Sequence, residues 1–77
     1  MVQAFVLIQA RVGMASRVGQ AVGAIQGVRS ADIVTGPYDV VARVEAASID
    51  ALGRLVVSKI QAVEGVARTL TCPVVRL

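Results

Sequence analysis

The sequence contains no histidine and only one cysteine, Cys72. A single cysteine excludes a disulfide within the chain, and one thiol without histidine cannot complete a closed zinc site. The lack of histidine also removes the commonest general base and the usual activator of a serine or cysteine nucleophile. The carboxylates form no close pair at motif spacing; they are Asp32, Asp39, Glu45, Asp50 and Glu64. We therefore expect no catalytic residues, no metal site and no cofactor.

Long apolar runs and clustered positive charge are also missing. No stretch approaches the ~18 to 20 apolar residues that cross a bilayer, and residues 1–10 lack the basic start and extended apolar core of a signal peptide. Eight basic and five acidic residues give a net charge of +3, but the basic residues are spread from Arg11 to Arg76 with no two adjacent. A nucleic-acid interface favours a clustered basic stripe. We expect a cytoplasmic protein that binds neither membrane nor nucleic acid directly.

Aliphatic residues are what the chain has in abundance. Its 77 residues allow one domain, residues 1–77, and 56% of them are hydrophobic although only 3% are aromatic. A domain this short buries only about 60% of the surface of its unfolded chain, and it has no disulfide or metal to add stability. Some apolar surface must then lie outside, where such patches usually mark an interface. Composition alone predicts an oligomer.

Hydrophobic periodicity predicts six elements in the order β-α-β-β-α-β. The expected strands span residues 2–10, 28–34, 39–46 and 66–75, and the expected helices span residues 14–26 and 48–63. Ser48 is suited to cap the second helix. The expected buried stripe of that helix consists of Ile49, Leu52, Val56, Ile60 and Val63, and Leu55 and Val57 fall outside it.

The two halves of the chain echo each other. The residues at 25–28, Ile-Gln-Gly-Val, return as Val-Glu-Gly-Val at 63–66, at the same helix-to-strand junction. Two β-α-β units with right-handed crossovers give an α+β, ferredoxin-like fold, in which two helices cover one face of a four-stranded antiparallel sheet. The first strand is apolar on both faces at its centre, residues 5–8. We therefore expect the chain to dimerise through the open face of the sheet.

Two smaller features leave their role open. Gly19 and Gly23 lie four residues apart in the first helix, where they either permit another backbone to approach closely or mark a weak, partly exposed helix. Cys72 falls within an apolar strand, and a thiol buried there is expected to be inert.

The stretch most informative about function is Thr35–Asp39, between the second and third strands. It combines Gly36, the only tyrosine, Tyr38, and the carboxylate of Asp39. Glycine allows a ligand carboxylate to approach backbone N–H groups, an aspartate accepts hydrogen bonds from an ammonium group, and a tyrosine forms a wall or donates its hydroxyl. This set suits a free amino acid, whereas the simpler interpretation is a plain turn in which Asp39 caps the loop.

The run from Thr35 to Val44, TGPYDVVARV, resembles the hairpin of the RAM domain, the effector domain of Lrp/AsnC regulators. That hairpin has a glycine, a free position, an aromatic residue and an aspartate. The segment Gly65–Thr71, followed by Val74 and Val75, is similar to the last strand of the same domain. The β-α-β-β-α-β order matches over essentially the whole chain, so the sequence resembles a stand-alone RAM domain.

The resemblance implies an oligomeric sensor of a small-molecule effector. Members of this family pair two sheets face to face and often assemble the dimers further, into tetramers or octamers. Their effectors, typically amino acids, bind where dimers meet. On this chain the effector contacts implied are Gly36, Tyr38 and Asp39, with Thr69 and Thr71 from the last strand. The family's helix-turn-helix is not found in these residues, so the resemblance implies no direct contact with DNA. It implies either a sensor in its own right or one that co-assembles with full-length Lrp/AsnC regulators.

Three other functions fit the same fold. Enzymes of the dimeric α+β-barrel type share the shape, but they usually need a histidine, aspartate or tyrosine in a cleft. An ACT-type regulatory module also binds amino acids, and the Gly-Pro-Tyr-Asp hairpin favours a RAM domain over it. An RNA-binding ferredoxin-like domain needs stacking aromatic residues on its open sheet face, and Phe5 and Tyr38 are the only aromatic residues here.

Overall fold

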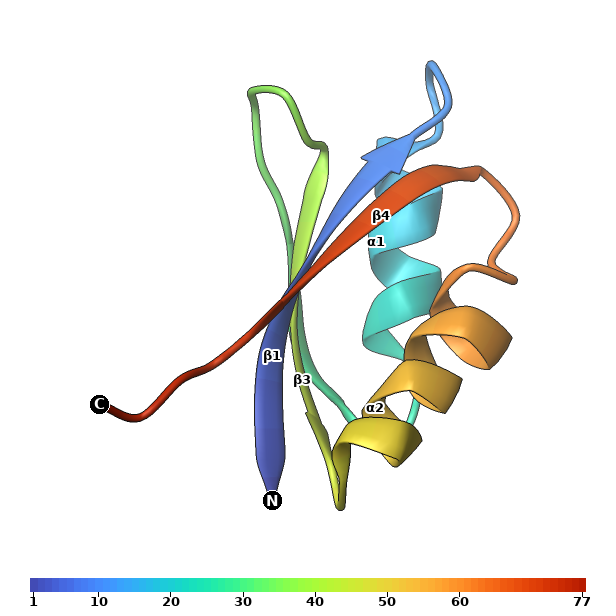
Figure 1. The fold of residues 1–77 in the computed structure, drawn as a ribbon. Helices are drawn as coiled ribbons and strands as arrows, with labels where there is room; N and C mark the ends of the chain where they lie inside the picture. Colours follow the sequence, from blue (N-terminus) through green and yellow to red (C-terminus); the bar gives the residue numbers. More distant parts are fainter.

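The computed structural model describes all 77 residues as one sheet with helices on one side (Figure 1). The elements along the chain are β1 (Val2–Ala10), α1 (Ala15–Gly23), β2 (Val28–Ile33), β3 (Val40–Ala46), α2 (Ile49–Arg54), the π-helix η1 (Leu55–Ile60) and β4 (Val66–Pro73). The strands lie in the order β2-β3-β1-β4, and every neighbouring pair is antiparallel. The predicted α+β, ferredoxin-like fold is confirmed.

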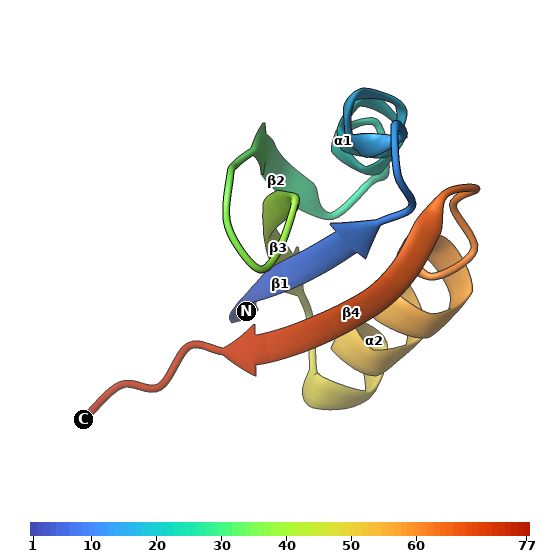
Figure 2. The same ribbon diagram turned by 90° about the horizontal axis from the view of Figure 1, so that it is seen from above.

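The two faces of the sheet differ in their covering. The face under the helices carries side chains that are completely buried; in β1 and β3 these are Ala4, Val6, Ile8, Val40, Ala42 and Val44. The opposite face, which we call the open face, has no element over it (Figure 2). An apolar row crosses it, because Leu7 of β1 pairs with Val41 of β3 and Leu70 of β4. Phe5 lies two residues before Leu7 in β1, on the same face. Its side chain is 43% exposed, and that of Leu70 is 47% exposed.

The second helix differs from its prediction. One α-helix was expected to continue to Val63, but α2 passes at Leu55 into η1, where the N–H of Gln61 donates to the carbonyl of Val56, five residues back, at 2.8 Å. The adjacent β-branched residues Val56 and Val57 fit an α-helix poorly because they crowd the preceding turn. The helix ends at Ile60, and Val63 lies in the turn that follows.

The repeated junction is confirmed as the same turn in both halves. The N–H of Val28 donates to the carbonyl of Ile25 at 3.1 Å, and that of Val66 donates to the carbonyl of Val63 at 3.2 Å. Gly27 and Gly65 have φ values of 99° and 97°, in the region that side chains rarely adopt. This turn also explains why α1 stops at Gly23, before the predicted end at Gln26.

Three predictions about single residues are resolved. Ser48 caps α2 as expected, with its Oγ accepting from the N–H of Ala51 at 3.1 Å. Ile49 was assigned to the buried stripe wrongly: it is 60% exposed, because the sheet lies under the next turn, at Leu52. The prediction of a buried Cys72 is also wrong for the single chain, since Cys72 is exposed and pairs with Phe5 on the open face.

The glycines of α1 have separate roles. Gly19 is buried, and a Cβ there would lie 3.1 Å from Cγ1 of Ile33 in β2, closer than most real contacts. A Cβ on Gly23 would lie 3.7 Å from that of Ala31, an ordinary contact. The close approach of α1 to β2 therefore depends on Gly19, and Gly23 is the weak, exposed position.

Candidate functional site

Asp39 joins the hairpin to the end of β1. Its N–H donates to the carbonyl of Ile8 at 2.9 Å, and its Oδ2 accepts from the N–H of Ala10 at 2.8 Å. Its carbonyl accepts from the N–H of Val34 across the loop at 2.9 Å. Asp39 therefore has the capping role of the plain-turn interpretation, and its second carboxylate oxygen has no hydrogen-bond partner within the chain.

An open hollow of about 590 Å³ is lined by this hairpin and by the loop from β1 to α1, which lie at the same end of the sheet (Figure 1). We call it the hairpin hollow. It is lined by Gln9, Ala10, Arg11, Val12, Gly13, Ala15, Gly36, Pro37, Asp39 and Ala67. Gly36 has a φ of 143° and open space where a Cβ would stand. Gln9, near the end of β1, donates from its Nε2 to the carbonyl of Pro37 at 3.4 Å and so links β1 to the hairpin.

The hairpin hollow contains one side chain of each charge, Arg11 and Asp39. They form no ion pair with each other; the single ion pair of the chain joins Arg29 and Glu45 at 3.7 Å on neighbouring strands. Sequence reasoning missed Arg11 because it counted the arginines as scattered surface charge. Its place at the end of a strand, beside the loop that precedes a helix, was the available signal.

The structure brings together only part of the predicted site. Gly36 and Asp39 line the hairpin hollow, whereas Tyr38 is half-buried and does not line it. Thr69 and Thr71 line a different hollow of about 380 Å³, between β4 and the second helix. There the Oγ1 of Thr69 accepts from Gln61 Nε2 at 2.9 Å. Within one chain the two threonines are therefore separate from the hairpin residues.

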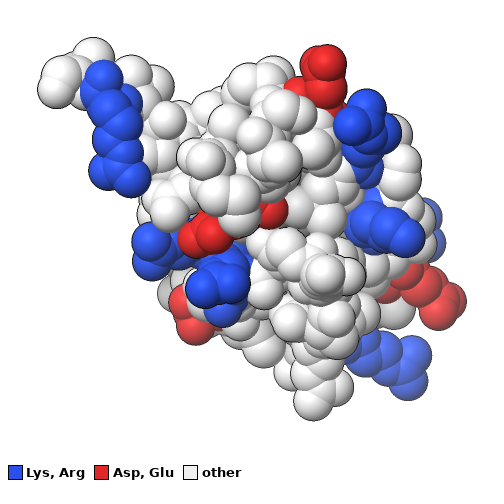
Figure 3. Space-filling view, turned by 90° about the horizontal axis from the view of Figure 1, so that it is seen from below, with Lys and Arg blue, Asp and Glu red and all other residues white.

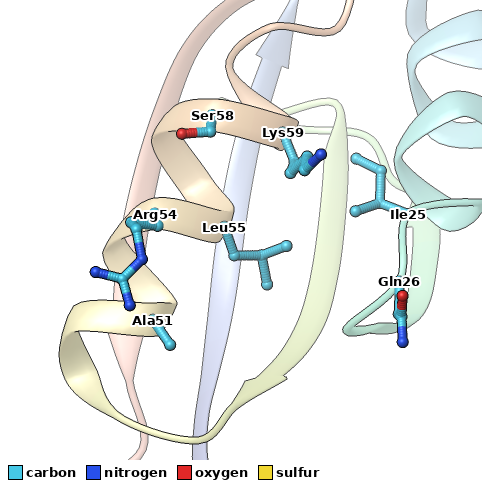
Figure 4. A pocket seen from close by; sticks show the side chains of 7 residues that line it. All are labelled: Ile25, Gln26, Ala51, Arg54, Leu55, Ser58 and Lys59. Atoms are coloured by element: carbon cyan, nitrogen blue, oxygen red, sulfur yellow. The ribbon is translucent and has the colours of Figure 1, made fainter.

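A third hollow, of about 560 Å³, lies between the turn after α1 and the second helix (Figure 4). We call it the helix hollow. It is lined by Ile25, Gln26, Ala51, Arg54, Leu55, Ser58 and Lys59. The sequence hinted at it only through Leu55, the apolar residue outside the buried stripe.

Charged side chains do not gather into one patch. Figure 3 shows lysine and arginine side chains distributed around one face of the molecule, several of them beside acidic ones. No group of three or more metal-ligating side chains is present. Neither helix has the length and apolar character of a membrane span.

Comparison with known proteins gives the family. Residues 3–77 match the family described as the Lrp/AsnC ligand binding domain. TTHA0845 from Thermus thermophilus has the same fold, with a TM-score of 0.93 and 38% identity over all of this chain and 96% of that one.

Two further relatives are longer proteins. The HTH-type transcriptional regulator PF0250 of Pyrococcus furiosus is 34% identical over 54 residues, which are 70% of this chain and 36% of the regulator. The regulator NMB0573 of Neisseria meningitidis, solved as a complex with L-Met, shares the fold with a TM-score of 0.84 and 21% identity, over 97% of this chain and 50% of that one. The chain thus spans about a third to a half of the regulators it matches. Because the family match extends over nearly every residue, the chain belongs to the Lrp/AsnC ligand-binding domain family.

Proposed function

We propose that this domain is an oligomeric sensor of a free amino acid that acts by co-assembly with full-length Lrp/AsnC regulators. The observation that carries the proposal is the hairpin hollow, where Arg11 and Asp39 line one space without pairing with each other. The family match supports ligand binding in general. The hollow adds the chemistry of the ligand.

The charges of the hollow suit a zwitterion. The guanidinium of Arg11 is matched to a carboxylate, and the free oxygen of Asp39 is matched to an ammonium group. Gly36 leaves room for the ligand to approach the backbone. The hollow has no histidine or cysteine to activate an amino acid chemically, so we propose binding without conversion.

A second copy of the domain is the proposed partner at the open face. The row Val41–Leu7–Leu70 would otherwise leave aliphatic side chains in water, and burying apolar area is the main favourable term in association. The polar residues Gln3 and Glu45 hydrogen-bond to each other on the same face, at 3.3 Å, and form its rim. Thr69 and Thr71 face the helix side of β4, and Tyr38 does not line the hairpin hollow of its own chain. We therefore propose that these three residues reach an effector only where such dimers assemble further.

We propose that the effect of ligand binding reaches DNA through longer regulators of the same family. PF0250 is a transcriptional regulator, and the matched part is about a third of its length. NMB0573 is a transcriptional regulator solved with L-Met. A domain with the same fold can enter such an assembly through the open face and change its response to the effector.

A thermal-shift screen with the twenty amino acids tests the sensing proposal. A ligand that binds only the folded state raises the free energy of unfolding, by about 2.7 kcal/mol at one hundred times its Kd. We expect at least one amino acid to raise the Tm. The proposal is wrong if none does at millimolar concentration.

Two pairs of variants assign the effect to the hairpin hollow. Asp39→Asn keeps an oxygen for the N–H of Ala10 but removes the charge, so it should fold normally and lose the ligand-induced shift. Asp39→Ala loses the hydrogen bond as well and should melt lower even without ligand. Arg11→Gln should abolish the shift, whereas Arg17→Gln, an exposed cation outside every hollow, should leave it intact.

A further inference from the structure

The helix hollow is floored by apolar side chains that come from two separate segments. Ile25 lies in the turn after α1, and Leu55 and Ala51 lie on the second helix. In Figure 4 Leu55 and Lys59 project from η1 toward Ile25, and Arg54 lies on the other side of the helix. The space has the volume of a small-molecule site, since such sites typically occupy ~300 to 1,000 Å³.

The backbone around this hollow is specialised on both sides. On one side is η1, and π-helical turns are rare and occur frequently at functional sites. On the other side is Gly27, where an added Cβ would lie 3.2 Å from Cδ2 of Leu55 and 3.3 Å from the carbonyl of Glu45. The side chain of Leu55 therefore packs directly against Gly27, a glycine that the turn requires. This contact fixes the position of Leu55 in the wall of the hollow.

The charge of the helix hollow has one sign only. Lys59 and Arg54 line it, no carboxylate does, and neither cation takes part in an ion pair. This differs from the hairpin hollow, where Asp39 accompanies Arg11. An ammonium group in the helix hollow would meet Lys59 and no carboxylate, with Arg54 adding positive charge from the other side of the helix, whereas a carboxylate would meet a cation of opposite charge.

We propose that the helix hollow is a second ligand site, which binds a small aliphatic monocarboxylate without an ammonium group, the class to which 2-oxo acids belong. Lys59 binds the carboxylate, Arg54 adds positive charge from the far side of the helix, and Ile25, Ala51 and Leu55 contact the aliphatic chain. The site is independent of the amino-acid site at the hairpin, so either can fail without the other.

The single lysine makes a direct test possible. Reductive methylation with ¹³C-formaldehyde keeps the charge of the amine and places a label on Lys59 and the chain's amino terminus only. Titration with 4-methyl-2-oxopentanoate should shift the Lys59 methyl signal in a saturable way. Leucine, which has the same carbon skeleton and an ammonium group, should shift it at least about tenfold more weakly, a difference of ~1.4 kcal/mol. Equal response to both, or no saturable shift with the oxo acid, overturns the proposal.

Calorimetric titration of three charge variants locates the site with unmodified protein. Lys59→Gln should weaken binding of the oxo acid by about tenfold or more, the loss expected for one charge-assisted hydrogen bond. Arg54→Gln should weaken it less, and the matched control Arg17→Gln should not change it. All three side chains are exposed, so the substitutions should not alter folding. An unchanged Tm of each variant checks this. Equal loss in the Arg17 and Lys59 variants would reduce the binding to general electrostatic attraction and overturn the site.

Discussion

The two faces of strand β1 carry similar apolar side chains that differ in burial. Val6 and Ile8 point toward the helices and are completely buried, whereas Phe5 and Leu7 point away and remain partly in water. The side chains are of the same apolar kind, so composition does not distinguish the faces. What differs is the covering, which one chain supplies for one face only. The open face resembles the covered face in its side chains but lacks a covering element. Substitutions on each face measure how much that face contributes to folding and how much to association.

The largest effect is expected on the covered face. Ile8→Ala removes a completely buried side chain and leaves a cavity, which typically costs ~2 to 5 kcal/mol. In a domain this small that loss approaches the whole free energy of unfolding. We expect the variant to be largely unfolded by circular dichroism at every protein concentration. A cooperative transition near that of the parent would show that the helix face is not the principal core.

A charge on the open face should act on association first. Leu7→Lys places an ammonium group in the middle of the apolar row, where a second copy would have to desolvate it. We expect the variant to lose the dependence of Tm on protein concentration, which the parent shows if it assembles. Gln9→Lys, an exposed position on the same face near the end of β1, is the control and should retain that dependence. Loss in both variants would contradict a specific apolar contact.

Cys72 reports on the same face by its reactivity. It is exposed in the single chain and pairs with Phe5, so a covered open face would shield its thiol. We expect a maleimide reagent to modify the parent at least about tenfold more slowly than the Leu7→Lys variant, because reaction in the parent requires transient dissociation. Equal rates would mean that nothing covers this part of β4.

The smallest effect concerns the distance of α1 from the covered face. Alanine is favoured over glycine inside a helix by about 1 kcal/mol. Gly23→Ala should gain part of this, because Gly23 is the last residue of α1 and its Cβ would make an ordinary contact. Gly19→Ala should gain less still, because Ile33 must move. Urea denaturation of the two variants measures the difference. An equal gain in the free energy of unfolding would show that α1 is not closely packed against β2 at Gly19.

Much of the fold was predictable because it follows from local periodicity. The alternation in β1 assigned Val6 and Ile8 to one face and Phe5 and Leu7 to the other, and the repeated Gly-Val junctions marked both helix-to-strand turns. The π-helical turns of η1 were not predictable, because apolar spacing alone does not distinguish them from α-helical turns.

The candidate site was predictable only in part. Gly36 and Asp39 are neighbours in sequence, so a motif could find them, but Arg11 reaches the same hollow from another loop through the pairing of β1 with β3. The placement of Thr69 and Thr71 on the helix side of β4 depends on the register with β1, which no local pattern fixes. The helix hollow depends on the packing of Leu55 against Gly27, a contact between segments that are distant in the sequence.

The mass of the parent protein in solution tests the central claim most directly. If a second copy covers the open face, light scattering at micromolar concentration should give at least twice the 8.0 kDa of one chain. A mass of 8.0 kDa for the folded protein at that concentration would contradict the account.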